Sequence, residues 1–200
     1  MSLLLNVAKF LPIVSIVILL CGLIYRLFSS RKKKWPTTYL LLLLFFEVYP
    51  YILQYYNLPI LSISAFIHFA FLTYFFYSDF FDSKHIYKYI ILGLGISPLI
   101  ILYPTMNSSR DYQAYSTFIY DFVIVICIFI FYLKKMKVPQ NYDKRIDRFI
   151  NCALLYFSFD LFLSISSNYL VNESLILVAG FWFLRAILLQ LYYVAIIRYE

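Results

Sequence analysis

The sequence predicts an all-α polytopic membrane protein with seven transmembrane helices, its N-terminus outside and its C-terminus cytoplasmic. Three observations predict this fold class. Of the 200 residues, 64% are hydrophobic and only 14% are charged. This is too small a share of charged residues to cover the surface of a soluble domain. The charges are clustered, so several stretches are long and apolar enough to match the hydrocarbon core of a bilayer. Lys and Arg also gather in alternate connectors, as they do on the cytoplasmic side of membrane proteins.

Polar breaks separate the first three predicted spans. The first span, 5–28, ends before the polar and basic run at 29–34. Because this run follows the apolar residues and no small-residue cleavage site is present, we expect a retained helix and not a cleaved leader. The second and third spans, 37–56 and 59–81, are joined as a tight hairpin by an Asn-Leu-Pro turn.

The last four spans are bounded in the same way. An Asp-Ser-Lys sequence precedes the fourth span, polar residues follow it, and a long basic connector separates the fifth span from the sixth. We expect residues 1–200 to form a single seven-helix transmembrane domain. These four spans are 87–104, 113–134, 147–169 and 174–197.

The positive charges predict the orientation. With the N-terminus outside, all but three of the 17 Lys and Arg residues lie on the cytoplasmic side. The exceptions are Lys9 and Arg110, which lie on the outer side, and Arg185, which lies inside the last span. Every cytoplasmic connector is then more positive than every outer one, so the asymmetry does not depend on one loop.

Composition also narrows the location. Because the positive charges lie in connectors, the net charge of +7 is expected to meet lipid head groups of the bilayer, and no nucleic acid is expected as a partner. The abundance of Lys, Ile, Asn, Tyr and Phe, together with compact connectors, favours a bacterial cytoplasmic membrane.

The sequence predicts neither a cofactor nor a metal centre, and no catalytic motif. Cys21, Cys127 and Cys152 fall in different spans and lack the paired spacing of a disulfide framework or a zinc site. No HExxH or GxSxG sequence is present. We therefore expect a protein that is not an enzyme.

Five ionisable side chains lie deep inside predicted spans. Such a group costs about 3 kcal/mol or more at the centre of a bilayer, so each is a functional candidate. The structural alternative is that these groups pair with one another and hold the helices together. Three acids face one permanent cation and one histidine, so two carboxyl groups would still need a proton, water or a bound cation. The five residues are Glu47, His68, Asp121, Asp160 and Arg185.

Polar residues follow the outer halves of several spans. Gln113, Thr117 and Asp121 recur at i, i+4 and i+8 on one helix face, and Ser164 follows Asp160 at the same spacing. The cytoplasmic halves are mostly apolar. This pattern predicts a pocket open to the outside for a proton or a small cationic ligand. Its candidate residues are Glu47, His68, Thr117, Asp121, Asp160, Ser164 and Arg185, with Gln190 as a weaker member.

Several of the 21 tyrosines lie near predicted span ends, Tyr192 and Tyr193 among them. An amphipathic ring is well suited to the boundary between membrane and water. We therefore expect many of these tyrosines to lie at the interface.

Two functions fit these observations. The longest connector, 135–146, is too short for a soluble output domain. We therefore expect a receptor-like or accessory subunit of a membrane complex, which signals or assembles through a separate membrane or cytoplasmic protein. The alternative is a small proton- or cation-coupled transporter or channel, in which the acids and His68 carry protons or bind a cation. An intramembrane enzyme acting on lipid is a third class, without a motif in its favour.

Overall fold

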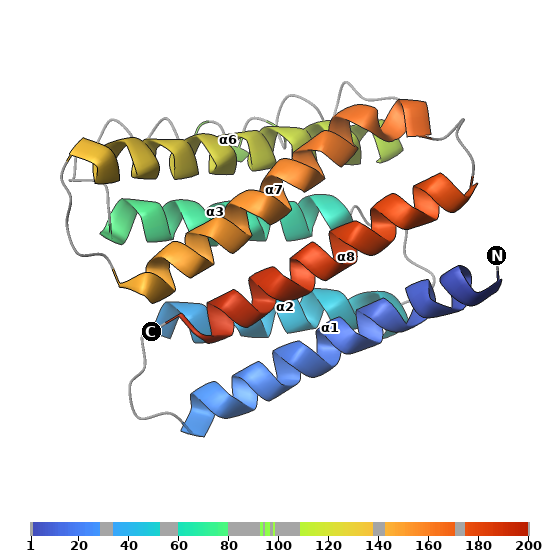
Figure 1. The fold of residues 1–200 in the computed structure, drawn as a ribbon, viewed down its shortest axis with the longest axis horizontal. Helices are drawn as coiled ribbons and strands as arrows, with labels where there is room; N and C mark the ends of the chain where they lie inside the picture. Colours follow the sequence, from blue (N-terminus) through green and yellow to red (C-terminus); the bar gives the residue numbers. More distant parts are fainter. Residues whose placement is uncertain are drawn as a thin grey trace. The chain divides into compact units, whose positions relative to one another are not determined.

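The computed structural model describes residues 2–28, 34–52, 60–79, 109–137, 143–170 and 175–199, together with residues 93, 95, 96 and 98. The chain is all-helical in these ranges (Figure 1). Six helices account for most of the described residues. They are α1 (Ser2–Phe28), α2 (Lys34–Ile52), α3 (Ile60–Asp79), α6 (Ser109–Lys137), α7 (Lys144–Leu170) and α8 (Leu175–Ile197).

Six of the seven predicted spans coincide with these helices. The remaining predicted span, 87–104, lies almost entirely outside the described residues. Four of the described helices contain apolar segments long enough to cross a membrane, and α2 and α3 contain shorter apolar segments, Trp35–Tyr49 and Ser64–Phe76. Among the described residues the structure therefore shows six helices, four of which contain apolar segments of membrane-spanning length, and not seven spans. The long segments are Phe10–Phe28, Tyr115–Lys137, Lys144–Ser166 and Ile176–Ile197.

The helices form two compact units. We call residues 1–56, 142–159 and 166–200 the first unit, and residues 57–141 and 160–165 the second unit. The first unit contains α1, α2, α8 and most of α7, and the second contains α3 and α6. The expectation that residues 1–200 form a single domain stays a prediction.

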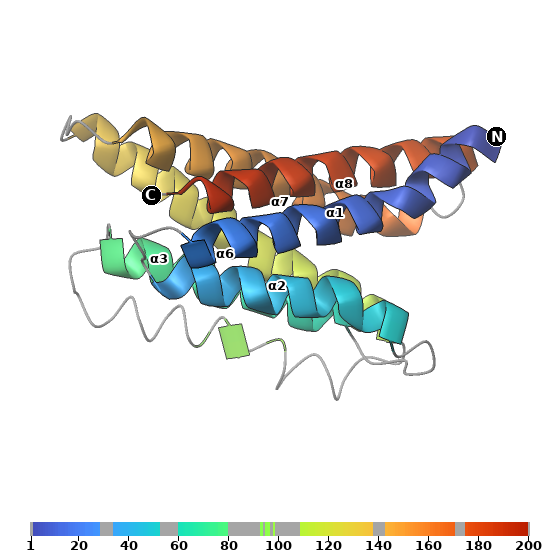
Figure 2. The ribbon, with the colours of Figure 1, turned by 90° about the horizontal axis from the view of Figure 1, so that it is seen from below.

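In the first unit, α1 packs against both α2 and α8 (Figures 1 and 2). Contacts fix the helix directions. Gln190 contacts Leu11 and Arg26 contacts Ile197, so α8 runs parallel to α1. Thr37, near the start of α2, also contacts Arg26 at the end of α1, so α2 runs in the opposite direction.

The faces of α1 are apolar on the outside and partly polar on the inside. Ile13, Val17, Leu20 and Ile24 recur on one face and are exposed. The opposite face includes Ser15, Leu19, Gly22 and Arg26, which are buried. A soluble helix has the reverse pattern, because its apolar face covers the core. An outward apolar face with polar groups inside is the arrangement that a lipid environment requires.

The second unit is built on a parallel pair of helices. Ala65, Phe69, Leu72 and Phe76 of α3 recur at i, i+4, i+7 and i+11 and are buried, and so are Tyr120, Ile124, Cys127 and Phe131 of α6. This spacing places each set in one seam. The ring centroids of Phe69 and Tyr120 lie 5.2 Å apart, and those of Phe76 and Phe131 lie 6.4 Å apart. Because both contacts advance together along the two helices, α3 and α6 run parallel.

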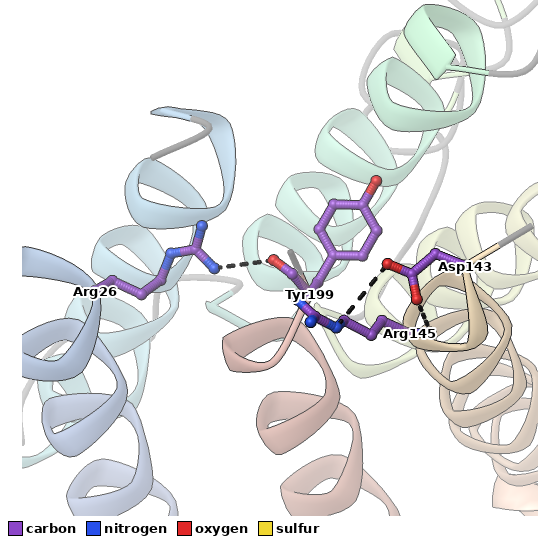
Figure 3. Close-up of polar contacts among 4 residues, drawn as sticks. All are labelled: Arg26, Asp143, Arg145 and Tyr199. Carbon is purple, nitrogen blue, oxygen red and sulfur yellow. Dashed lines mark hydrogen bonds and ion pairs between the residues drawn. The ribbon is translucent and has the colours of Figure 1, made fainter. Parts of the chain in front are cut away.

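Side chains satisfy the backbone groups at two helix ends of the first unit (Figure 3). Asp143 caps the start of α7, since its carboxylate accepts from the N–H of Arg145 at 3.0 Å. Arg26, only 2% exposed, donates to the carbonyl oxygens of Ile196, Ile197 and Tyr199 at 3.5, 3.4 and 3.3 Å. These carbonyls lie at the C-terminal end of α8, where a cation also meets the negative end of the helix dipole.

Arg26→Gln should destabilise the protein by about 2–3 kcal/mol, because the buried carbonyl groups at the end of α8 would lose a charged donor. Unfolding of the purified protein in sodium dodecyl sulfate, followed by circular dichroism, measures this. Arg198→Gln removes one charge from an exposed position nearby and should change stability by no more than about 0.5 kcal/mol. Equal effects of the two substitutions would show that Arg26 does not hold α8.

Candidate functional site

The seven candidate residues all lie within helices, and they divide between the two units. Glu47 and Arg185 belong to the first unit and are half-buried. The other five belong to the second unit. The prediction that all seven share one pocket stays a prediction. The five in the second unit are His68, Thr117, Asp121, Asp160 and Ser164.

Tyrosine hydroxyl groups contact both charged candidates of the first unit. The hydroxyl of Tyr193 donates to Oε1 of Glu47 at 2.8 Å. The guanidinium of Arg185 donates to the hydroxyl of Tyr156 at 3.1 Å. We call these four residues, together with Tyr39 and Tyr192, the tyrosine cluster. The last two join α2 to α8 by a hydrogen bond of 2.8 Å between their hydroxyl groups.

Ring packing holds the cluster together around Tyr192. The rings of Tyr156 and Tyr192 are stacked, with centroids 5.7 Å apart and planes at 14°. Phe149 stacks on Tyr192 as well, with centroids 5.9 Å apart and planes at 22°. Phe157 meets Tyr192 edge-on at 5.4 Å. Contacts of this kind stabilise by about 1 kcal/mol each beyond the area that they bury.

Tyr192 and Tyr193, near the end of α8, face the interior of the first unit. Both are buried there, where their hydroxyl groups reach Tyr39 and Glu47. Their position along the helix, which favours the membrane interface, does not decide which way the side chains face. These two face inward, and the inward hydroxyl groups find partners on α2.

Helical periodicity explains how α2 presents its part of the cluster. Tyr39, Leu43 and Glu47 recur at i, i+4 and i+8, so the helix places them along one face. Tyr39 and Leu43 are fully buried, whereas Glu47 is half-buried at the far end of this stripe. Had tyrosine been counted as a polar residue, the spacing used for the other spans would have found this stripe.

The guanidinium of Arg185 also lies near two aromatic rings. Its Cζ atom is 5.7 Å from the ring centroid of Tyr156 and 5.4 Å from that of Trp182. Both distances fall within the range of cation–π attraction. Arg185 attracts the carboxylate of Glu47 electrostatically. The charge of Arg185 is therefore stabilised by ring faces and a hydroxyl group as well as by the more distant acid.

Three ionisable candidates in the second unit are buried: His68, Asp121 and Asp160. Asp121 is the most enclosed, at 1% exposure, and follows the half-buried Thr117 by one helical turn on α6. Nearby, the hydroxyl of Tyr120 donates to the carbonyl oxygen of Gly95 at 3.1 Å. All three ionisable residues are therefore enclosed by protein in the second unit, and their role in a pocket stays a prediction.

Two hydrogen bonds join polar groups of α1 and α8 inside the first unit. Gln190 donates to the carbonyl oxygen of Leu11 at 3.1 Å and to the hydroxyl of Ser15 at 3.5 Å. Arg26, one of the basic residues that the sequence assigns to the cytoplasmic side, is buried near the end of α1. The sequence contains a signal for the burial of Arg26. Ser15, Gly22 and Arg26 recur at i, i+7 and i+11 and therefore share one face of α1.

Within the part of the chain that the structure describes, no three His, Cys, Asp or Glu side chains come close enough to hold a metal ion. No protein-family model matches this chain, and no curated protein or solved structure matches it either. The fold and the tyrosine cluster therefore define the class of protein: an all-helical chain with several apolar helices of membrane-spanning length and a polar interior.

Tyr193→Phe should destabilise the protein more than Tyr39→Phe. The first substitution removes a hydrogen bond to a carboxylate and should cost about 2–3 kcal/mol, whereas the second removes a bond between two hydroxyl groups and should cost about 1 kcal/mol. Both side chains are buried and both substitutions delete one oxygen, so each is a control for the other.

A double-mutant cycle with Glu47→Gln tests whether the contact between Tyr193 and Glu47 is the cause. Unfolding free energies of the two single variants and the double variant give the coupling energy. Additive effects would contradict the assigned contact.

Proposed function

We propose that this chain is a non-enzymatic multi-pass protein of a bacterial cytoplasmic membrane that acts as a receptor-like or accessory subunit. It senses a proton or small cationic ligand through its polar interior and passes the change to a separate partner protein. The observation that carries this proposal is the tyrosine cluster, in which the charged groups Glu47 and Arg185 connect α2, α7 and α8 through tyrosine hydroxyl groups.

Membrane embedding is supported by the distribution of polar groups. Large apolar side chains are exposed along α1, α6 and α8, whereas buried positions hold charged or polar residues such as Arg26, His68 and Asp121. In water this distribution would be unfavourable on both counts, since apolar surface would be hydrated and polar groups would be dehydrated. In a bilayer the exposed apolar faces meet lipid tails.

Seven crossings that alternate in direction agree with the helix directions within each unit, and the basic connectors favour an N-terminus outside. In the second unit α3 and α6 run parallel, and the end of α3 at Asp79 must connect to the start of α6 at Ser109. Crossings that follow one another alternate in direction, so a parallel pair requires one crossing between them. In the first unit α1 runs parallel to α8, as the first and last of seven crossings do.

Cysteine labelling tests this topology on a cysteine-free background. A membrane-impermeant maleimide should label Ser109→Cys in intact cells, because the start of α6 is proposed to face outward. Met136→Cys, which is exposed near the other end of α6, should react only after the membrane is permeabilised. Asp79→Cys, at the end of α3, should behave like Met136→Cys. Labelling of Asp79→Cys in intact cells would contradict a crossing between the two helices.

A cluster that links three helices can transmit a change of charge. If Glu47 binds a proton or a cation, its hydrogen bond from Tyr193 and its attraction to Arg185 both weaken. Tyr193 lies on α8 and Tyr156 on α7, so the altered contacts act on both helices. A separate partner is needed to receive this movement, because every connector is too short to form a soluble domain.

The alternative, a small proton- or cation-coupled transporter or channel, is favoured by the second unit. It holds buried His68, Asp121 and Asp160, whose side chains can exchange protons inside a membrane. Transport would make these groups essential for flux, whereas a subunit would need them only for folding or for contact with its partner.

Purification of the tagged protein from its native host in a mild detergent, with mass spectrometry of the co-eluting proteins, separates the two functions. The subunit proposal predicts a near-stoichiometric partner with the wild-type chain, and less partner with Glu47→Gln. Asp121→Asn should leave the partner in place if the first unit makes the contact. A clean protein without a partner, whose proteoliposomes move protons or cations and lose this flux on Asp121→Asn, would establish the transporter instead.

A further inference from the structure

The carboxylate of Glu47 has one oxygen available for a ligand. Tyr193 donates to Oε1, whereas Oε2 makes no hydrogen bond with a described residue. The side chain is half-buried, so this second oxygen lies within the first unit at the edge of the tyrosine cluster. A carboxylate in this setting binds a cation more strongly than it would in water, because the surroundings screen the charge less.

The cluster also has the aromatic component of a cation site. The ring faces of Tyr156 and Trp182 both attract a guanidinium group, that of Arg185, at 5.7 and 5.4 Å. Trp182 is 50% exposed, so this side of the site is open at the surface of the unit. Aromatic faces next to a carboxylate are the features that recognise organic ammonium and guanidinium ions.

A metal ion fits this place less well than an organic cation. A metal site needs several oxygen, nitrogen or sulfur ligands, and the described residues include no group of three acidic, His or Cys side chains at metal-binding distance. Glu47 accepts from the phenol hydroxyl of Tyr193 and attracts Arg185, whose own neighbours are two aromatic faces. These attract a diffuse, weakly hydrated cation, such as a guanidinium or alkylammonium ion.

We propose that Glu47, Tyr156 and Trp182 form a binding site for a small organic cation, and that Arg185 is a tethered occupant which competes with the free ligand. The inference rests on the proposed function and names the class of ligand for the same site. A free cation that pairs with Glu47 takes the ring faces from Arg185. The hydrogen bond from Arg185 to Tyr156 then breaks, which removes one of the contacts between α8 and α7.

Fluorescence of Trp182 reports directly on this competition. The chain has two tryptophans, and Trp35→Phe leaves Trp182 as the single reporter. On this background methylguanidinium chloride should change the emission in a saturable way, whereas equal concentrations of sodium chloride or urea should not. Arg185→Gln should lower the half-saturating concentration about tenfold, because it removes the tethered competitor. Adding Glu47→Gln to this variant should abolish the response.

Arg198→Gln is the matched control, because it removes the same charge from an exposed position on the same side of the chain. It should titrate like the parent protein. A folded Arg185→Gln protein that gives no saturable response, or that responds equally with Glu47→Gln, would overturn the inference. If Arg185→Gln does not fold, Glu47→Gln alone is decisive, since a response that persists without the carboxylate also overturns it.

The titration uses the purified chain without a partner, so its failure is distinguishable from failure of the proposed function. If a partner co-purifies but the protein gives no fluorescence response, the subunit proposal stands and the proposed ligand site is contradicted. If the protein responds but no partner co-purifies, the ligand site stands and the subunit proposal is contradicted.

Discussion

The need to satisfy polar groups inside apolar helices governs the first unit of this protein. A helix satisfies its own backbone except at its ends, so only its polar side chains and its terminal groups need partners. Arg26 satisfies the carbonyl groups at the end of α8, and Gln190 reaches a carbonyl group of α1. Each contact joins two helices that share apolar surfaces. Hydrogen bonds therefore decide which positions along the helices face one another.

Tyrosine has a particular place in this interior. Its ring packs as an apolar side chain does, while its hydroxyl group both donates and accepts hydrogen bonds. Tyr193 contacts the carboxylate of Glu47, and Tyr156 accepts from Arg185. A direct buried ion pair would have to offset the cost of dehydrating both charges. The two charges contact different hydroxyl groups, so Glu47 can change its charge state while Arg185 keeps its hydrogen bond to Tyr156.

Helix directions connect the interior to the topology. The neighbours α3 and α6, and likewise α1 and α8, run parallel, and their side-chain contacts fix these directions. An antiparallel hairpin, by contrast, joins α7 to α8: Phe149 lies beside Tyr199 and Phe159 beside Phe181. These pairings arise from packing and hydrogen bonds, whereas the charge of the connectors acts independently and favours one orientation of the whole chain.

The sequence by itself determined the helical class and the approximate bounds of six helices. Long apolar runs with isolated charges indicate such helices directly, because the core of a bilayer requires long apolar segments and disfavours charged side chains. The tertiary structure alone decided which residues meet. Tyr192, Tyr193 and Arg26 lie near helix ends in the sequence, and only the packing shows that their side chains face inward and are buried. A helix face is fixed by periodicity, but its partner depends on how distant helices pack, and local sequence carries no record of that.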